Sequence, residues 1–341
     1  MAKKQSKKIS EMLASNIKEI ATGITSEKLS AQFFDATKLK YQPEPLYRLD
    51  IGDNRWYYRF ENDAPIFYTS VTTLIKNTLP TNPGLIKWLA DRGSEEGHAE
   101  AMSRAFYGTQ LHTYCAELLI NGKFNLDDLP AKLEASAKKE KMEIQSDWID
   151  EIKKDVLSFA QFAIDFQVEP LAIEQVLYHP KDGYAGAIDL VCFLNYEEKG
   201  NFGEVYASGT NKGQPKESKR IRRICALIDI KSGRKSFYES HQLQLRAYKF
   251  MWNYHFPDCP VERVFNFSPK DYRGIIPSYN FKDQTECDSA EKLPFLVELA
   301  KIEDKKKDKK LLITRGTIDL TKGLANNLCE KTFIELVKND K

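Results

Sequence analysis

The stretch that decides the fold reads GAIDLVCFLN at residues 186–195, CALIDIKSGR at 225–234 and HQLQLRAYKFMW at 241–252. The first two segments are apolar runs typical of buried strands, yet they carry Asp189 and Asp229, and Lys231 follows two positions after Asp229. Because side chains alternate along a strand, Asp229 and Lys231 are expected on one face. A carboxylate in an apolar strand is costly unless a partner compensates its charge. The pattern therefore indicates a metal ion and a positioned ammonium group.

Five short motifs occur in and before this stretch in a fixed order. They are Gly108-Thr-Gln-Leu-His112 in a predicted helix, Glu174 in a predicted strand, Asp189 in GAID, Asp229-Ile230-Lys231, and Gln244-x-x-x-Tyr248 in a predicted helix. In this order they resemble the PD-(D/E)XK nuclease superfamily. The helical His and the Glu before the first acid are similar to its RecB-like exonuclease branch, of phage and bacterial type. The resemblance covers roughly residues 104–280.

The resemblance implies an α/β fold with a restriction-endonuclease-like core, in which helices flank a central mixed sheet. It also implies catalytic roles for five residues: His112, Glu174, Asp189, Asp229 and Lys231. One or two Mg²⁺ or Mn²⁺ ions would be held by His112, Asp189, Asp229 and the carbonyl of Ile230. Carboxylate, carbonyl and imidazole ligands suit these ions.

Further roles follow from the same resemblance. Glu174 would support a second ion or a metal-bound water, and Lys231 would orient the nucleophile and stabilise negative charge. Gln244 and Tyr248 would contact DNA or steady the site. Arg234 and Lys235, in the loop after the second acidic strand, would face incoming phosphates. Such phosphate contacts give affinity without base specificity.

The domain organisation expected from the sequence has three parts. Residues 1–100 form an N-terminal helical and hairpin extension, 101–285 form the nuclease core, and 286–341 form a C-terminal helical segment. The core carries an exposed insertion at 195–222, which is expected either to be mobile or to form an extra hairpin. The patterns predict helices within 1–40 and at 84–93, 103–120, 126–141, 145–166, 238–255, 289–302 and 321–338, with strands at 171–179 and 261–267. A hairpin is expected around Asn62-Asp63, and a helix capped by Ser70 is expected next.

Two other segments bear on function. SVTTLI at 70–75, followed by LIKWLADRG at 85–93, resembles the N-terminal lead-in of phage and bacterial members of the family. The basic residues between Lys212 and Arg220 in the insertion are expected to add salt-dependent DNA contacts. GTIDL at 316–320 echoes GAIDL, but no acid-x-Lys strand follows it, so Asp319 is predicted to lie outside the site.

Composition narrows the class of protein. With 42% hydrophobic and 29% charged residues and no apolar run of about 18 residues, the chain is typical of a globular protein without a membrane span. The basic start lacks the apolar core of a secretory signal, so a cytosolic location is expected, in a bacterial or phage-infected cell. The six cysteines are dispersed, which predicts reduced thiols and no iron–sulfur cluster. HExxH, CxxC and GxxxxGK[ST] are absent from the sequence, which argues against zinc hydrolysis and a nucleotide-driven motor.

The function expected from these patterns is metal-dependent hydrolysis of DNA by an exonuclease of recombination, repair or phage DNA metabolism. DNA is the expected partner, a recombination or replication protein is a candidate partner, and the oligomeric state stays open. Two alternatives remain: a structure-specific or nicking endonuclease, and a non-catalytic DNA-binding subunit that keeps the fold. Replacing Asp189 or Asp229 by Ala is expected to maintain or raise stability, because like charges repel in the metal-free site.

Overall fold

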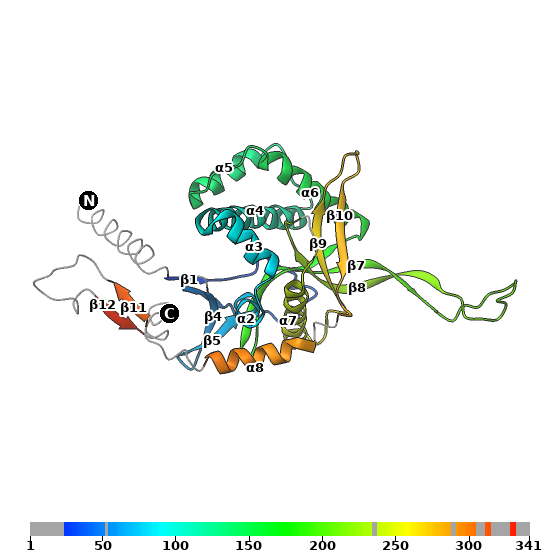
Figure 1. Ribbon diagram of the computed structural model, residues 1–341. Helices are drawn as coiled ribbons and strands as arrows, with labels where there is room; N and C mark the ends of the chain where they lie inside the picture. The colour runs from blue at the N-terminus through cyan, green and yellow to red at the C-terminus, as the bar shows by residue number, and fades with distance from the viewer. Residues whose placement is uncertain are drawn as a thin grey trace, which may run out of the picture.

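The computed structural model describes residues 24–51, 54–233, 237–287, 291–304, 311–314 and 328–331. Ten strands form one mixed sheet in the order β1-β3-β4-β5-β7-β8-β9-β10, with β6 on the other edge of β7 and β2 beside β6 (Figure 1). These strands are β1 Ile24–Lys28, β2 Phe33–Phe34, β3 Tyr47–Ile51, β4 Asn54–Glu61, β5 Ala64–Ser70, β6 Glu169–His179, β7 Tyr184–Gly200, β8 Ser218–Ile230, β9 Arg263–Lys270 and β10 Ser278–Asp283. A separate pair consists of β11 Leu311–Thr314 and β12 Leu328–Lys331.

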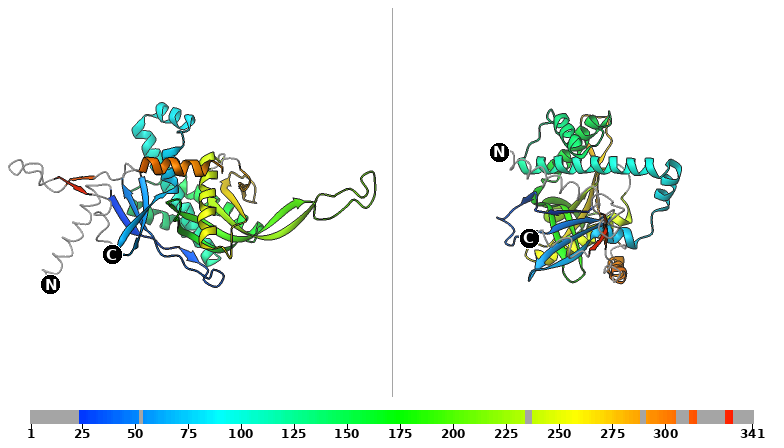
Figure 2. Two further views of the ribbon diagram at one scale, coloured as in Figure 1. Left: turned by 90° about the horizontal axis from the view of Figure 1, so that it is seen from below. Right: turned by 90° about the vertical axis from the view of Figure 1, so that its left-hand side faces the viewer.

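Helices cover both faces of this sheet, so the chain has a mixed α/β fold (Figures 1 and 2). They are α2 Val71–Thr78, α3 Pro83–Arg92, α4 Ser94–Asn121, α5 Leu129–Glu140, α6 Trp148–Asp165, α7 Glu239–His255 and α8 Leu293–Asp304. Buried residues of α4 and α6 pack on one face of the central strands, and those of α5 join the same core by packing on α6. Those of α2, α7 and α8 pack on the other face.

The alternation of side chains in β8 explains why both faces are covered. Ile224, Ala226 and Ile228 join the core beneath α4 and α6, whereas Cys225 and Leu227 join the core beneath α7. All five are buried. Burying an aliphatic side chain of this size contributes about 1.5–3 kcal/mol, so a strand that is apolar on both faces needs helices on both sides. Asp229 therefore stands in the most apolar part of the sheet.

One edge of β7 is shared by two strands that reach it from opposite ends. β5 runs parallel to β7 and pairs with its first two residues, Tyr184 and Ala185. β8 runs antiparallel and pairs with β7 from Leu190 onward. Among the described residues, the stretch 186–189 lies between these two ladders on this edge, and the carboxyl ends of β5 and β8 both point at it.

The structure confirms several of the elements predicted from the sequence. Ser70 accepts a hydrogen bond from the main-chain N–H of Thr73 at 3.0 Å and so caps α2. The hairpin of β4 and β5 turns at Asn62-Asp63, both with positive φ. The predicted helices near 84–93, 126–141, 145–166 and 238–255 correspond to α3, α5, α6 and α7, and the helix predicted at 103–120 begins earlier, as α4.

Other predictions were wrong. The C-terminal segment is not wholly helical, because Leu328–Lys331 of the predicted 321–338 helix is strand β12, paired with β11. The predicted helix within 1–40 is contradicted at 24–28 and 33–34, which are strands, and residues 1–23 lie outside the described part. In both segments, strand pairing prevails over local helical periodicity.

The predicted N-terminal extension and the predicted insertion are both part of the main sheet. The segment 1–100 was expected as an extension, yet β1, β3, β4 and β5 continue the same sheet as the core strands. The insertion at 195–222 is largely built from β7 and β8 themselves, which pair as far as Gly200 and Ser218 and project from the body as a two-stranded ribbon (Figures 1 and 2). In the described part of the chain, no helix has the length and apolar character needed to cross a bilayer.

The close packing of α7 on β7 generates a prediction at Gly186. A Cβ atom at this position would lie 2.7 Å from Cε1 of Tyr248, so Gly186→Ala must displace the ring. Overpacking of this kind costs about 1–3 kcal/mol, which we expect as a lower free energy of unfolding in urea. Gly200→Ala is the control, since its Cβ would make an ordinary contact at 3.6 Å with Phe202. Equal stability of the two variants would contradict the close contact.

Candidate metal centre

His112 lies in the middle of α4, where the helix crosses the end of β8. Gly108, one turn earlier, allows this approach, because a Cβ there would lie 3.2 Å from Oγ of Ser232. Nε2 of His112 is 2.8 Å from the carbonyl oxygen of Ile230, to which it donates. Its Nδ1 lies 3.5 Å from Oε1 of Glu174 and 3.8 Å from Oδ1 of Asp189. The ring therefore bridges the main chain of β8 and two carboxylates of β6 and β7.

Glu174 and Asp189 face each other across the β6–β7 ladder. Ile173 pairs with Leu190 and Gln175 pairs with Ile188, so the two acids are opposite neighbours. Like charges in such a pair are destabilising. Glu174 also has a positive φ of 51°, a conformation that a non-glycine residue rarely adopts. Backbone strain combined with charge repulsion is typical of a functional site rather than of a stabilising contact.

The pKa values of His112 and Asp189 show how the negative charge of the carboxylates is compensated in the metal-free site. Burial lowers the pKa of His112, but the charge of Asp189 and the contact with Glu174 outweigh it and raise the pKa to about 9. Burial raises the pKa of Asp189 to about 7, with Asp229 and Glu174 adding repulsion and His112 opposing the shift. The imidazolium thus provides positive charge among the acids.

Asp229 and Lys231 form a second group on the side of α7. The Asp229 carboxylate is 1% exposed and accepts hydrogen bonds from Nζ of Lys231 at 2.8 Å and from the amide of Asn266 at 2.7 Å. Nζ of Lys231 also lies 3.2 Å from Oε1 of Gln244, whose amide donates to the hydroxyl of Tyr248 at 2.9 Å. Burial lowers the pKa of Lys231, but Asp229 and Asp189 outweigh it, so the pKa rises and the ammonium keeps its charge.

The peptide groups of Ile230 join the two groups. Its N–H donates to Oδ2 of Asp189 at 2.7 Å, and its carbonyl accepts from His112. The main-chain N–H at the end of β8 is therefore bound by a side chain of β7, that of Asp189, and not by a main-chain carbonyl of β7. The next N–H, that of Lys231, donates to the carbonyl of Phe267 in β9 at 2.8 Å. Main-chain bonds thus fix the side chains of the site.

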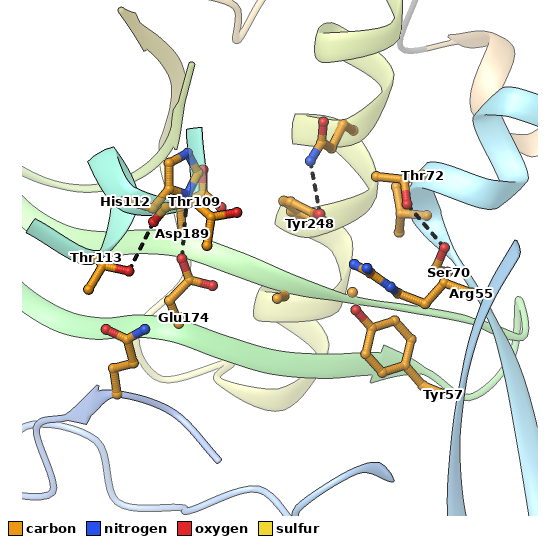
Figure 3. Close-up of a pocket in the computed structure, with 15 residues that line it drawn as sticks. Arg55, Tyr57, Ser70, Thr72, Thr109, His112, Thr113, Glu174, Asp189 and Tyr248 are labelled. Carbon is orange, nitrogen blue, oxygen red and sulfur yellow. Dashed lines mark hydrogen bonds and ion pairs between the residues drawn. The ribbon is translucent and has the colours of Figure 1, made fainter. Parts of the chain in front are cut away.

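A cavity of about 340 Å³ adjoins the acid cluster (Figure 3). Its walls include His112, Glu174, Asp189, Gln244 and Tyr248, all of which the sequence had singled out. They also include residues for which the sequence indicated no role in the site: Gln32, Arg55, Tyr57, Thr72, Thr109 and Thr113. Thr109 and Thr113 follow from the helical periodicity around His112. Arg55 and Tyr57 had no local signal, because only the joining of β5 to β7 brings β4 to the site.

The donor atoms fit a divalent cation. One ligand atom each from His112, Glu174 and Asp189 lies within 4.8 Å of the others. Two carboxylates and an imidazole suit Mn²⁺, and the carboxylates suit Mg²⁺. Of the ligands expected from the sequence, Asp229 is held by Lys231 and Asn266, and the Ile230 carbonyl is held by His112. Glu174, expected to have a supporting role, instead belongs to the cluster.

Two of the predicted site residues lie outside the described part of the chain, but the structure does show the charge of the predicted insertion. These two are Arg234 and Lys235. In the two-stranded ribbon of β7 and β8, basic residues lie beside acids. Lys219 pairs with Glu197 at 2.8 Å, and Arg220 pairs with Glu198 at 3.2 Å. The ribbon therefore presents no simple basic patch. Comparison with models of known protein families finds no match to this chain, and comparison with characterised proteins finds none either. The residues and their geometry alone carry the functional inference.

The geometry reverses the expected stability of one variant. Asp229→Ala would leave the buried amide of Asn266 without its acceptor. The ammonium of Lys231 would keep its contact with a neutral amide oxygen but lose its partner of opposite charge in this pair. We expect the free energy of unfolding to fall by roughly 2–4 kcal/mol, less than for a fully buried pair because the Lys231 side chain is 24% exposed. Asp189→Asn keeps an oxygen for the N–H of Ile230 and relieves repulsion, so it should be at least as stable as the wild type. Urea denaturation checks both, and an Asp229→Ala variant of wild-type stability would contradict the network.

Proposed function

We propose that the chain is a metal-dependent hydrolase of DNA phosphodiester bonds, an exonuclease of the RecB-like branch of the PD-(D/E)XK superfamily. One observation carries the proposal. The cluster of His112, Glu174 and Asp189 and the ion pair of Asp229 and Lys231 meet at the two sides of Ile230. Cation ligands next to a held ammonium group are what hydrolysis of an anionic ester requires.

The chain's own side chains have separable tasks. When bound, a divalent ion lowers the pKa of water and neutralises phosphate charge. Lys231, fixed by Asp229 and Gln244, directs its positive charge to the phosphate oxygens as negative charge develops. Glu174 borders the cavity and can accept a proton from the attacking water. Asp189 anchors the peptide N–H of Ile230 and so keeps β8 in register with these groups.

A second cavity supports a polymeric substrate. It has a volume of about 590 Å³ and adjoins Lys231, whereas Gln244, the partner of Lys231, borders the first cavity. The walls of the second cavity are of mixed charge, since they include Arg104, Phe237 and His241 as well as the acids Glu100, Glu151 and Asp155. Two cavities, one bordered by Lys231 and the other by its partner Gln244, suit a chain that continues beyond the cleaved bond, which a small monoester would not need.

The alternative of a non-catalytic DNA-binding subunit accounts for fewer of these features. In such a protein, phosphate groups are contacted by basic side chains such as Lys and Arg and by main-chain N–H groups. A cluster of Glu174 and Asp189 would repel the phosphate backbone, and the strain at Glu174 would have no compensating role. An endonuclease would use the same chemistry, so only the form of the substrate separates it from an exonuclease.

The test compares end-labelled linear duplex DNA with covalently closed circles, in Mg²⁺ or Mn²⁺ and in excess chelator. We expect progressive loss of the linear DNA, intact circles, and no cleavage in chelator or by Asp189→Asn. Rapid nicking or linearisation of the circles would favour the endonuclease. If the folded protein binds Mn²⁺ and DNA but cleaves neither substrate, the non-catalytic alternative holds.

A further inference from the structure

The cavity has a second wall, whose charge is opposite to that of the acids. Arg55 and Tyr57 of β4 lie on this wall with Ser70 and Thr72, at the junction of β5 and α2 (Figure 3). Glu174 and Asp189 lie on the other wall. Ser70 and Thr72 belong to the SVTTLI segment, for which the chemistry described so far gives no role.

This wall is a built part of the fold. Ser70 pairs with Ala185 of β7, directly before the stretch that carries Asp189. The main-chain N–H of Arg55 donates to Oγ1 of Thr73 at 3.0 Å, which ties β4 to the first turn of α2. Arg55 and Tyr57 are two residues apart on β4 and therefore share a face. The strand junction that forms this wall of the cavity therefore also places the side chain of Arg55 at the cavity.

A second contact orients the Arg55 guanidinium. Its Nε donates to Oδ1 of Asp50 at 2.9 Å, and Asp50 in turn pairs with Arg48 at 2.9 Å. Because Asp50 receives Nε, the terminal nitrogens remain on the side of the cavity (Figure 3). Burial opposes the charge, but Tyr57 and Asp50 outweigh it and raise the pKa of Arg55. A guanidinium in this setting stays charged and can contact phosphate through two nitrogens.

We propose that Arg55, with the hydroxyl of the exposed Thr72, binds the backbone phosphate next to the one that is cleaved; the buried Ser70 hydroxyl lies 3.1 Å from that of Thr72 and holds it in place. The inference rests on the proposed function, because it assumes that the acid cluster receives the scissile phosphate. One cavity then holds two adjacent phosphates of a strand, one at the acidic wall and one at the basic wall. The contact positions the strand without reading its sequence. Arg55 is thus a substrate-binding residue, and it makes its contact only with a substrate that contains more than one phosphodiester.

The test compares a substrate that has neighbouring phosphates with one that has none, and each variant is compared with the wild type on the same substrate. One is a short single-stranded oligonucleotide, and the other is the p-nitrophenyl ester of thymidine 5′-phosphate. We expect Arg55→Ala to lower kcat/KM for the oligonucleotide by roughly 10- to 100-fold, mainly through KM, as for the loss of a hydrogen bond to a charged group. The rate with the ester should not change. Arg55→Lys, which keeps the charge but not the fork, should fall between the wild type and Arg55→Ala.

Arg48→Ala is the matched control, because Arg48 contacts the same Asp50 but does not border the cavity. It should behave as the wild type on both substrates. Thermal unfolding identifies any variant that fails to fold, and in that case Arg55→Lys decides. An equal loss on both substrates, or an effect no larger than that of Arg48→Ala, would overturn the subsite.

A binding measurement separates this inference from the proposed function. The affinity of a fluorescein-labelled oligonucleotide is measured by anisotropy in Ca²⁺, which takes the same kind of oxygen ligands as Mg²⁺. Arg55→Ala should weaken binding by roughly 10-fold or more, and a neutral methylphosphonate beside the scissile linkage should weaken the wild type but not the variant. A wild type that binds in this pattern without cleaving contradicts only the proposed hydrolysis. A wild type that cleaves while Arg55→Ala binds equally well contradicts only the subsite.

Discussion

The pairing of β7 is the constraint on which the site depends. An open edge of a strand leaves main-chain N–H and C=O groups that need partners. β5 and β8 share this edge from opposite ends, and between them the partners of Ile230 are the carboxylate of Asp189 and the imidazole of His112. Removing side chains from this junction would therefore disturb the strand end as well as the chemistry. The same junction draws β4 and the start of α2 to the cavity.

The metal-free site is costly, which distinguishes it from a structural ion pair. Glu174 and Asp189 repel each other, and Glu174 has a backbone conformation that costs on the order of 1–3 kcal/mol. Apolar residues at these positions would pack without either cost. The Asp229–Lys231 pair differs, because Asn266 and Gln244 satisfy it fully and it stabilises the fold. Stability and chemistry are thus assigned to different acids of the same site.

Much of this site follows from the sequence, and the reasons are physical. An acid within an apolar strand, such as Asp189 or Asp229, needs a partner, and the alternation of strands places Lys231 beside Asp229. The partners themselves had no local signal. Asn266 lies in the next strand, and the engagement of Asp229 by Asn266 depends on the β8–β9 register. Arg55 comes to the cavity only through β5, a long-range contact that no periodicity encodes.

The fold shows the same division. Helices with a clear apolar stripe, such as α6, were predicted near their true ends, because burial of one face determines them. The C-terminal strands were not, since pairing between distant segments overrides local propensity there. The ribbon agrees with one of the two forms expected for the insertion, an extra hairpin. The N-terminal strands were expected as an appendage, although their pairing makes them a continuation of the main sheet.

The most direct test of the central claim is Mn²⁺ binding, followed by electron paramagnetic resonance and calorimetry, because it does not depend on finding the substrate. We expect Mn²⁺ to bind the wild type, and Asp189→Asn and Glu174→Gln each to weaken binding by at least roughly tenfold, since each removes a charged ligand. Glu117→Gln, also on α4 but paired with Lys132, is the control and should bind as the wild type does. Wild-type affinity in both Asp189→Asn and Glu174→Gln would contradict a metal centre at this site.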